Sequence, residues 1–225
     1  MAAKSSSSFR LSATPVTIFA HLLVIAVTTL VLVWLLNFRA GLAFESRIKE
    51  KIFNLHPLLM AIGFVLVAGE AIMSYKTVVA ERETQKIVHL ILHTIALTCG
   101  IIGINAVFKF HNELPIPVPH MYTLHSWIGM STFCLFGLQF LFAFFSFVFP
   151  GSDSGTRSRM APYHMFFGIV IFLMAIISAE TGLVERFIFL GLRRSQEALI
   201  MNFTGLLILL FGIAVGFAVI LPRRY

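Results

Sequence analysis

Charged side chains are scarce in this sequence of 225 residues, where Asp, Glu, Lys and Arg together make up 12%. An average soluble domain has about 25%. Apolar residues make up 58% of the chain, which excludes a water-soluble globular protein. It also excludes a disordered chain, because disordered chains are poor in apolar residues. A membrane-spanning helix needs about 20 apolar residues, so the length accommodates about six spans with short loops.

Cysteine is equally scarce, with only Cys99 and Cys134 in the whole chain, both inside apolar runs. No Cys-x-x-Cys-His sequence occurs, which excludes a covalently attached haem of that type. We expect both cysteines to be small buried apolar residues.

Six apolar runs divide the chain, and they are continuous rather than alternating, which predicts helices instead of barrel strands. The sequence therefore predicts an all-α, six-helix transmembrane bundle. We expect a tail over 1–15, one membrane domain over 16–221 and a tail over 222–225. With six spans both tails lie on one side, here called side A, and the opposite side is side B. The runs cover 16–36, 53–75, 88–110, 121–149, 162–184 and 198–221.

The positive charges do not orient the chain. Side A carries nine Lys and Arg residues and side B carries eight, whereas the positive-inside rule requires an excess on one side. The net charge of +7 comes from short loops beside the spans, so it does not indicate a nucleic-acid partner.

Eight histidines are the unusual feature of this apolar chain, because ionisable groups inside a membrane are costly and usually functional. His56 and His125 lie near the starts of spans that begin on side B. His89, His93 and His164 lie near the starts of spans that begin on side A. Two histidines on facing helices can bind one haem iron through both axial positions. Two such pairs would form a two-haem path across the bilayer.

Other interpretations stay open at this point. A transition-metal transporter could use the same histidines, although zinc and copper sites normally include Asp, Glu or Cys. A proton relay would need buried carboxylates, and the only acids within the spans are Glu70 and Glu180. A purely structural membrane protein is a further alternative. Spacing alone does not choose between His89 and His93, which share one helix face.

Several short segments in spans two to five resemble the eukaryotic cytochrome b561 family, the ascorbate-reducible transmembrane dihaem cytochromes. Taken together these segments are highly specific, and the short loops look most like those of the plant members. They are FNLHP at 53–57, GEAIMSYK at 69–76, KIVHLILH at 86–93, KFHN at 109–112, YTLHSWIG at 122–129, APYHMFFG at 161–168 and TGLVE at 181–185.

The resemblance implies two non-covalent haem b groups with four axial ligands. It pairs His56 with His125 on side B and His89 with His164 on side A, which makes His93 a neighbour rather than a ligand. It also implies further haem contacts from side chains near the two pairs. These are Lys76, Glu185, His120, Met121, Tyr122 and Thr123.

The resemblance places side A, and so both termini, in the cytosol, where ascorbate donates electrons. It implies that Lys86, Arg82 and Arg157 attract the ascorbate anion. On side B it implies that His111, helped by Lys109 and Phe110, contacts monodehydroascorbate or a ferric chelate.

The expected function is thus transmembrane electron transfer from cytosolic ascorbate to one of these acceptors. Some plant members carry a tyrosine in the stretch that is AFFSFVFPG here, so this chain lacks a hydroxyl that could contact ascorbate, and the effect on ascorbate affinity is left open. The vacuolar, vesicular and plasma membranes remain alternatives for its location. Whether two copies form a homodimer is also left open.

Overall fold

The computed structural model describes residues 12–222, and every regular element in that range is a helix. Six helices are long and apolar enough to cross a membrane, which confirms the predicted all-α bundle of six spans. The predicted tails fall largely on residues 1–11 and 223–225, which lie outside the described residues. The spans are Ala13–Phe38, Glu50–Thr77, Arg82–Asn112, Leu124–Val148, Ser154–Phe189 and Gln196–Ile220.

Three spans contain a π-helical segment, in which backbone hydrogen bonds join residues five apart instead of four. The first span is α1 (Ala13–Val33) followed by η1 (Trp34–Phe38). The second consists of α2 (Glu50–Phe53), α3 (Leu55–Leu58), η2 (Leu59–Leu66) and α4 (Val67–Thr77). The remaining spans are α5 (Arg82–Asn112), α6 (Leu124–Ala143) with η3 (Phe144–Val148), α7 (Ser154–Phe189) and α8 (Gln196–Ile220).

Polar caps explain where the helix ends differ from the apolar runs. Helix α7 begins at Ser154, well before the apolar run, because Asp153 caps it and accepts a hydrogen bond from the Thr156 N–H at 3.0 Å. Hydrogen bonds from Thr156 hold the pKa of the Asp153 carboxyl below its ordinary value. Helix α6 begins later than its run, because Thr123 and Ser126 form a capping box there.

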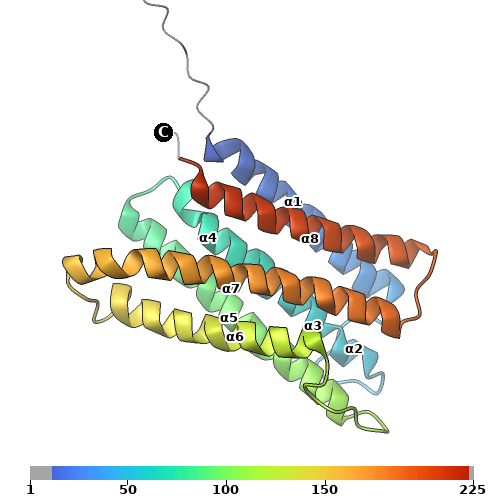
Figure 1. The fold of residues 1–225 in the computed structure, drawn as a ribbon. Coiled ribbons are helices and arrows are strands. Elements are labelled where there is room, and N and C mark those ends of the chain that lie inside the picture. Colours follow the sequence, from blue (N-terminus) through green and yellow to red (C-terminus); the bar gives the residue numbers. More distant parts are fainter. Residues whose placement is uncertain (1–11, 223–225) are drawn as a thin grey trace, which may run out of the picture.

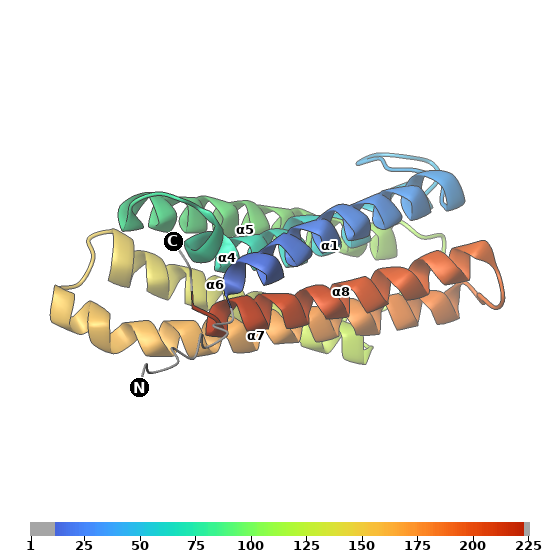
Figure 2. The same ribbon diagram turned by 90° about the horizontal axis from the view of Figure 1, so that it is seen from above.

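The bundle has two layers, which Figures 1 and 2 show from perpendicular directions. Helix α1, the second span and α5 form one layer, and α6, α7 and α8 form the other. Helix α1 packs on α8, and α7 packs on both α6 and α8. The Ala13 N–H donates to the Pro222 carbonyl at 3.0 Å, so the two ends of the described chain meet on side A, as expected.

The share of residues buried inside the bundle differs among the spans. Leu66, Met73, Ile208 and Phe211 are fully buried where the second span meets α8. Helix α6 has the smallest buried share of the six spans. The expectation of buried cysteines is wrong: Cys134 on α6 is exposed and Cys99 is half-buried. The apolar thiol is nevertheless compatible with these positions, because a membrane-facing surface is itself apolar.

Trp34, Arg39 and Glu197 form a cluster, here called the Glu197 cluster, that joins the side-B end of the first span to the start of the sixth. Glu197 Oε1 accepts a hydrogen bond from Trp34 Nε1 at 2.9 Å and another from Arg39 Nε at 2.6 Å. The side chains of Arg39 and Glu197 are only 18% and 12% exposed. Removal of one partner from a buried ion pair leaves an uncompensated charge, which is strongly destabilising.

We therefore predict that Glu197→Ala destabilises the protein by about 3 kcal/mol, measured as a lower Tm in detergent. Glu45→Ala is the control, because Glu45 pairs with Lys109 but its side chain is 81% exposed. Exposed pairs contribute about 0–1 kcal/mol, so its Tm should stay close to that of the wild type. Equal losses in the two variants would contradict the assignment of a stabilising role to the Glu197 cluster.

Candidate functional site

The start of the second span positions His56 through an interrupted helix. Pro57 has no N–H to donate, so the regular hydrogen-bond ladder is broken directly after His56. The π-helical segment η2 then begins at Leu59. Such segments occur frequently at functional sites, because they change the direction in which side chains point.

His56 and His125 face each other at the side-B end of the bundle. Their ring centroids are 6.0 Å apart and the ring planes make an angle of 82°. His56 Nδ1 lies 3.1 Å from the Gly103 carbonyl oxygen, and His125 Nδ1 lies 2.9 Å from that of Ser178. A carbonyl oxygen only accepts, so each Nδ1 carries the proton and each Nε2 keeps a free lone pair.

His125 reaches the Ser178 carbonyl because Gly182, one turn further along α7, has no side chain. A Cβ atom at position 182 would lie 2.7 Å from His125 Cε1 and 2.9 Å from Nδ1. These separations are far inside van der Waals contact. The imidazole therefore occupies the space that the missing Cβ leaves.

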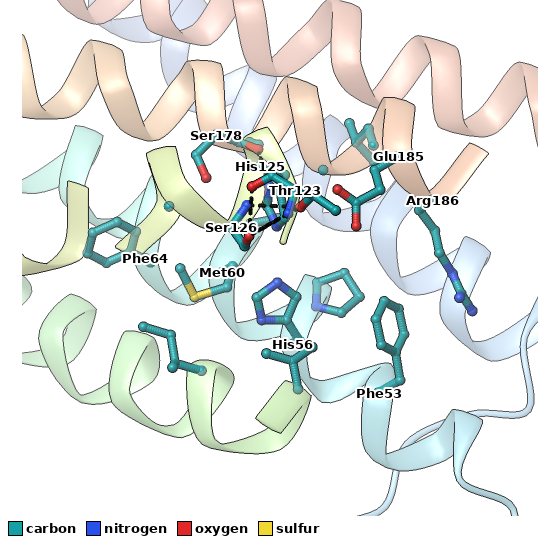
Figure 3. Close-up of a pocket in the computed structure, with 18 of the residues that line it drawn as sticks. Phe53, His56, Met60, Phe64, Thr123, His125, Ser126, Ser178, Glu185 and Arg186 are labelled. Carbon is teal, nitrogen blue, oxygen red and sulfur yellow. Dashed lines mark hydrogen bonds between the residues drawn. The ribbon is translucent and has the colours of Figure 1, made fainter. Parts of the chain in front are cut away.

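A cavity of about 390 Å³ surrounds this pair, and both histidines line it. Figure 3 shows His56 and His125 pointing toward each other, with Glu185 and Arg186 from α7 on one side of them. The volume is in the range of small-molecule and cofactor sites. Four of the six further haem contacts implied by the sequence line the cavity: Met121, Tyr122, Thr123 and Glu185.

His120 takes a different position, beside the proposed acceptor residue His111. Its Nε2 lies 2.9 Å from Asn112 Oδ1, and its ring stacks on His111 at a centroid distance of 5.3 Å. His111 and Phe110 line the cavity. Lys109 lies next to them but donates to the Phe44 carbonyl at 3.0 Å and pairs with Glu45.

His89 and His164 form the second pair, at the side-A ends of α5 and α7. Their ring centroids are 6.2 Å apart, with an angle of 77° between the planes. His89 Nδ1 lies 2.8 Å from the Ala71 carbonyl oxygen of α4. His164 Nδ1 instead lies 2.8 Å from the side-chain amide of Gln139.

His93 lies one turn along α5 from His89, with 4.4 Å between the ring centroids. Its Nδ1 is buried and has no hydrogen-bond partner. On the other side of the pair, Phe147 packs on His164 at 5.4 Å. Phe147 belongs to the stretch AFFSFVFPG, in which some plant members carry a tyrosine and this chain carries none.

Of the nine side-A cations, four have an expected role in the site, and three of these four lie near one carboxylate. Lys86 Nζ pairs with Glu83 Oε2 at 2.5 Å, and the charges of Arg82 and Arg157 also act on Glu83. Arg157 donates to the Ser152 carbonyl at 2.8 Å. The fourth cation has another partner: Lys76 Nζ donates to the Leu221 carbonyl at the end of α8, at 2.7 Å.

The two imidazole pairs have the separation that a shared metal requires. Two imidazoles that both bound one metal through nitrogens at about 2 Å would have their ring centroids roughly 6 Å apart. Both observed separations, 6.0 and 6.2 Å, agree with this value. Within residues 12–222, no group of three or more His, Cys, Asp or Glu side chains is arranged to hold a metal ion.

Comparison with known proteins shows which family shares this arrangement. A profile described as "Eukaryotic cytochrome b561" matches residues 55–190, which include both histidine pairs. The chain belongs to the eukaryotic cytochrome b561 family. The earlier resemblance is thereby confirmed, and so is the expected bundle.

Relatives in this cytochrome b561 family cover nearly the whole chain. A probable ascorbate-specific transmembrane electron transporter of Oryza sativa subsp. japonica is 45% identical over 94% of this chain and 92% of its own. A transmembrane ascorbate ferrireductase of Arabidopsis thaliana is 44% identical, over 90% and 86%. A transmembrane ascorbate-dependent reductase of Sus scrofa is 39% identical, over 88% and 78%.

The residues present fit the haem b that a cytochrome b561 implies. Each pair supplies two facing imidazoles, and the side-B pair opens into a largely apolar cavity. Sequence reasoning missed the partners of these rings. Gln139 had a detectable signal, because it is the only side-chain amide in the apolar run 121–149.

We predict that Gly182→Ala displaces His125 and lowers the amount of haem retained after purification. Loss of a ligand-orienting contact typically costs about 10–100-fold in affinity. The matched control is Gly137→Ala on α6, where a Cβ would have no neighbour within 4 Å. Haem content per chain, measured from the absorption spectrum, should fall only in the first variant. A Gly182→Ala protein with full haem content would contradict the close fit of the ring.

Proposed function

We propose that this chain is an integral, multi-pass membrane oxidoreductase that accepts electrons from ascorbate and passes them to an acceptor across the bilayer. The observation that carries the proposal is the presence of two facing histidine pairs at opposite ends of one six-span bundle. The names of the rice and Arabidopsis relatives, an ascorbate-specific electron transporter and an ascorbate ferrireductase, support the same function.

We assign one haem b to each pair, with His56 and His125 as the side-B ligands and His89 and His164 as the side-A ligands. Haem supplies reversible one-electron transfer when it is bound. The hydrogen bond from His89 to Ala71 supports its choice over His93, because it leaves Nε2 of His89 free toward His164. The chain's contribution is to hold each imidazole in a fixed orientation within an apolar interior.

The donor site in this proposal is the cationic end of α5 and α7 on side A, which we place in the cytosol together with both termini. Lys86, Arg82 and Arg157 provide positive charge that attracts the ascorbate anion. Glu83 competes for the same charges. Ascorbate therefore binds by displacing the exposed Glu83 carboxylate from Lys86.

The acceptor site in this proposal is the side-B surface around His111. His111 and Phe110 line the same cavity as the side-B pair, which gives a short path from that pair to a bound monodehydroascorbate or ferric chelate. Lys109 pairs with Glu45 in the structure. In this proposal Lys109 leaves Glu45 and binds the acceptor instead. A vacuolar, vesicular or plasma membrane location and a homodimer remain predictions that localisation and sizing experiments test.

Substitution of the two neighbouring histidines of α5 tests the ligand assignment. We predict that His89→Ala loses the side-A haem and retains about half of the wild-type haem per chain, because its partner imidazole is left alone. His93→Ala should retain the full haem content, because its ring nitrogens serve no ligand role. Haem per chain is measured from the absorption spectrum before and after addition of ascorbate. Equal losses in the two variants would refute the choice of His89.

Reconstituted vesicles test the function directly. Vesicles loaded with ascorbate should reduce an external ferric chelate only when they contain the protein. We predict that Lys86→Gln raises the KM for ascorbate about fivefold, as expected for the loss of about 1 kcal/mol of attraction at a partly exposed cation. Arg159→Gln, on the same helix as Arg157 but outside the assigned site, should keep the wild-type KM. Absence of any chelate reduction by wild-type vesicles would overturn the proposed function with a ferric acceptor.

A further inference from the structure

The fourth ligand histidine differs from the other three in what holds its ring. Backbone carbonyls face Nδ1 of His56, His89 and His125. A carbonyl can only accept, so the tautomer that leaves Nε2 free is imposed on these three rings. His164 alone has a side chain at this position, the amide of Gln139.

Gln139 makes two contacts with the same residue. Its Nε2 lies 2.8 Å from His164 Nδ1 and donates to the His164 carbonyl oxygen at 2.7 Å. The two ends of an amide have nearly the same shape, but one donates and the other accepts. A half-turn of the amide therefore exchanges a donor for an acceptor beside Nδ1 without moving the glutamine backbone.

These two orientations have opposite consequences for His164. An amide N–H directed at Nδ1 places the imidazole proton on Nε2, which then cannot bind iron. An amide oxygen directed at Nδ1 accepts a proton held there and leaves Nε2 free. The second orientation gives up the hydrogen bond to the His164 carbonyl, a loss that the other three ligand sites do not incur.

We propose that Gln139 is the positioning residue that sets the tautomer of His164 and thereby tunes the reduction potential of the side-A haem. This inference rests on the proposed function, since it requires a haem at the His89–His164 pair. Both partners are half-buried at the apolar interface of α6 and α7. Gly168, one turn further along α7, lies beside the amide, and a Cβ there would be in ordinary van der Waals contact with Gln139 Nε2 at 3.7 Å.

The strength of the acceptor at Nδ1 determines the direction of the effect. A stronger acceptor makes the imidazole a more basic ligand and favours oxidised iron. Gln139→Leu removes the acceptor, so the side-A haem should become easier to reduce. Gln139→Glu presents a carboxylate oxygen in either orientation, and a charged oxygen is a stronger acceptor than an amide oxygen. This variant should make the same haem harder to reduce.

The experiment measures the midpoint potentials of the purified haem-loaded protein by stepwise reduction, followed through the absorption spectrum. The component that disappears in His89→Ala is the side-A haem. We expect Gln139→Leu to raise its potential and Gln139→Glu to lower it, each by about tenfold in the ratio of oxidised to reduced haem, or 59 mV for one electron. The side-B component should stay unchanged. Ser131→Ala, an exposed polar position on the same helix, should move neither component.

Opposite shifts confined to the side-A component support the proposal. It is overturned if the two variants leave that component unchanged, or if they shift both components alike, as a general loss of structure would. If Gln139→Leu cannot be isolated, Gln139→Glu decides alone: an unchanged side-A potential overturns the proposal. A wild-type protein with only one haem component would instead refute the proposed function, so the two failures are distinguishable.

Discussion

A hydrogen bond from a ring nitrogen to a helix carbonyl is the interaction on which both histidine pairs depend. A neutral imidazole inside a bilayer has no water to satisfy its N–H group, so that group needs a protein partner. Helix carbonyls are available because each has a second lone pair beyond its helical bond. The carbonyls of Ala71, Gly103 and Ser178 serve in this way. Because ring and carbonyl must meet within about 3 Å, these bonds also determine how closely the helices approach.

The outline of the fold and the layering of the histidines follow from the sequence. Uninterrupted apolar runs can only be spans, and the rise of 1.5 Å per residue converts position along a run into depth. His56 and His125 are each close to the side-B start of their spans, so their common depth is visible without coordinates. His89 and His164 satisfy the same argument at side A. Helix ends are less visible, because caps such as Asp153 extend a helix beyond its apolar run.

The contacts of individual side chains are much less predictable. The carbonyl partners of the imidazoles leave no mark on the sequence, since every residue has a carbonyl. Long cations such as Lys76 reach partners distant in sequence, and the Leu221 carbonyl is one that only the packing of α4 against α8 reveals. Gly182 is intermediate: its presence is visible, but the ring that needs its missing Cβ is not.

The two-layer arrangement has a consequence for how the protein is made. Each histidine pair joins one helix from the first half of the chain to one from the second: α3 to α6, and α5 to α7. A ribosome that has delivered only the first three spans to the membrane has therefore placed His56 and His89 without their partners. At that stage neither proposed site would have both of its imidazoles. If each pair holds a haem as proposed, its binding would have to follow the packing of the second half on the first, and it would then join helices from both halves of the chain.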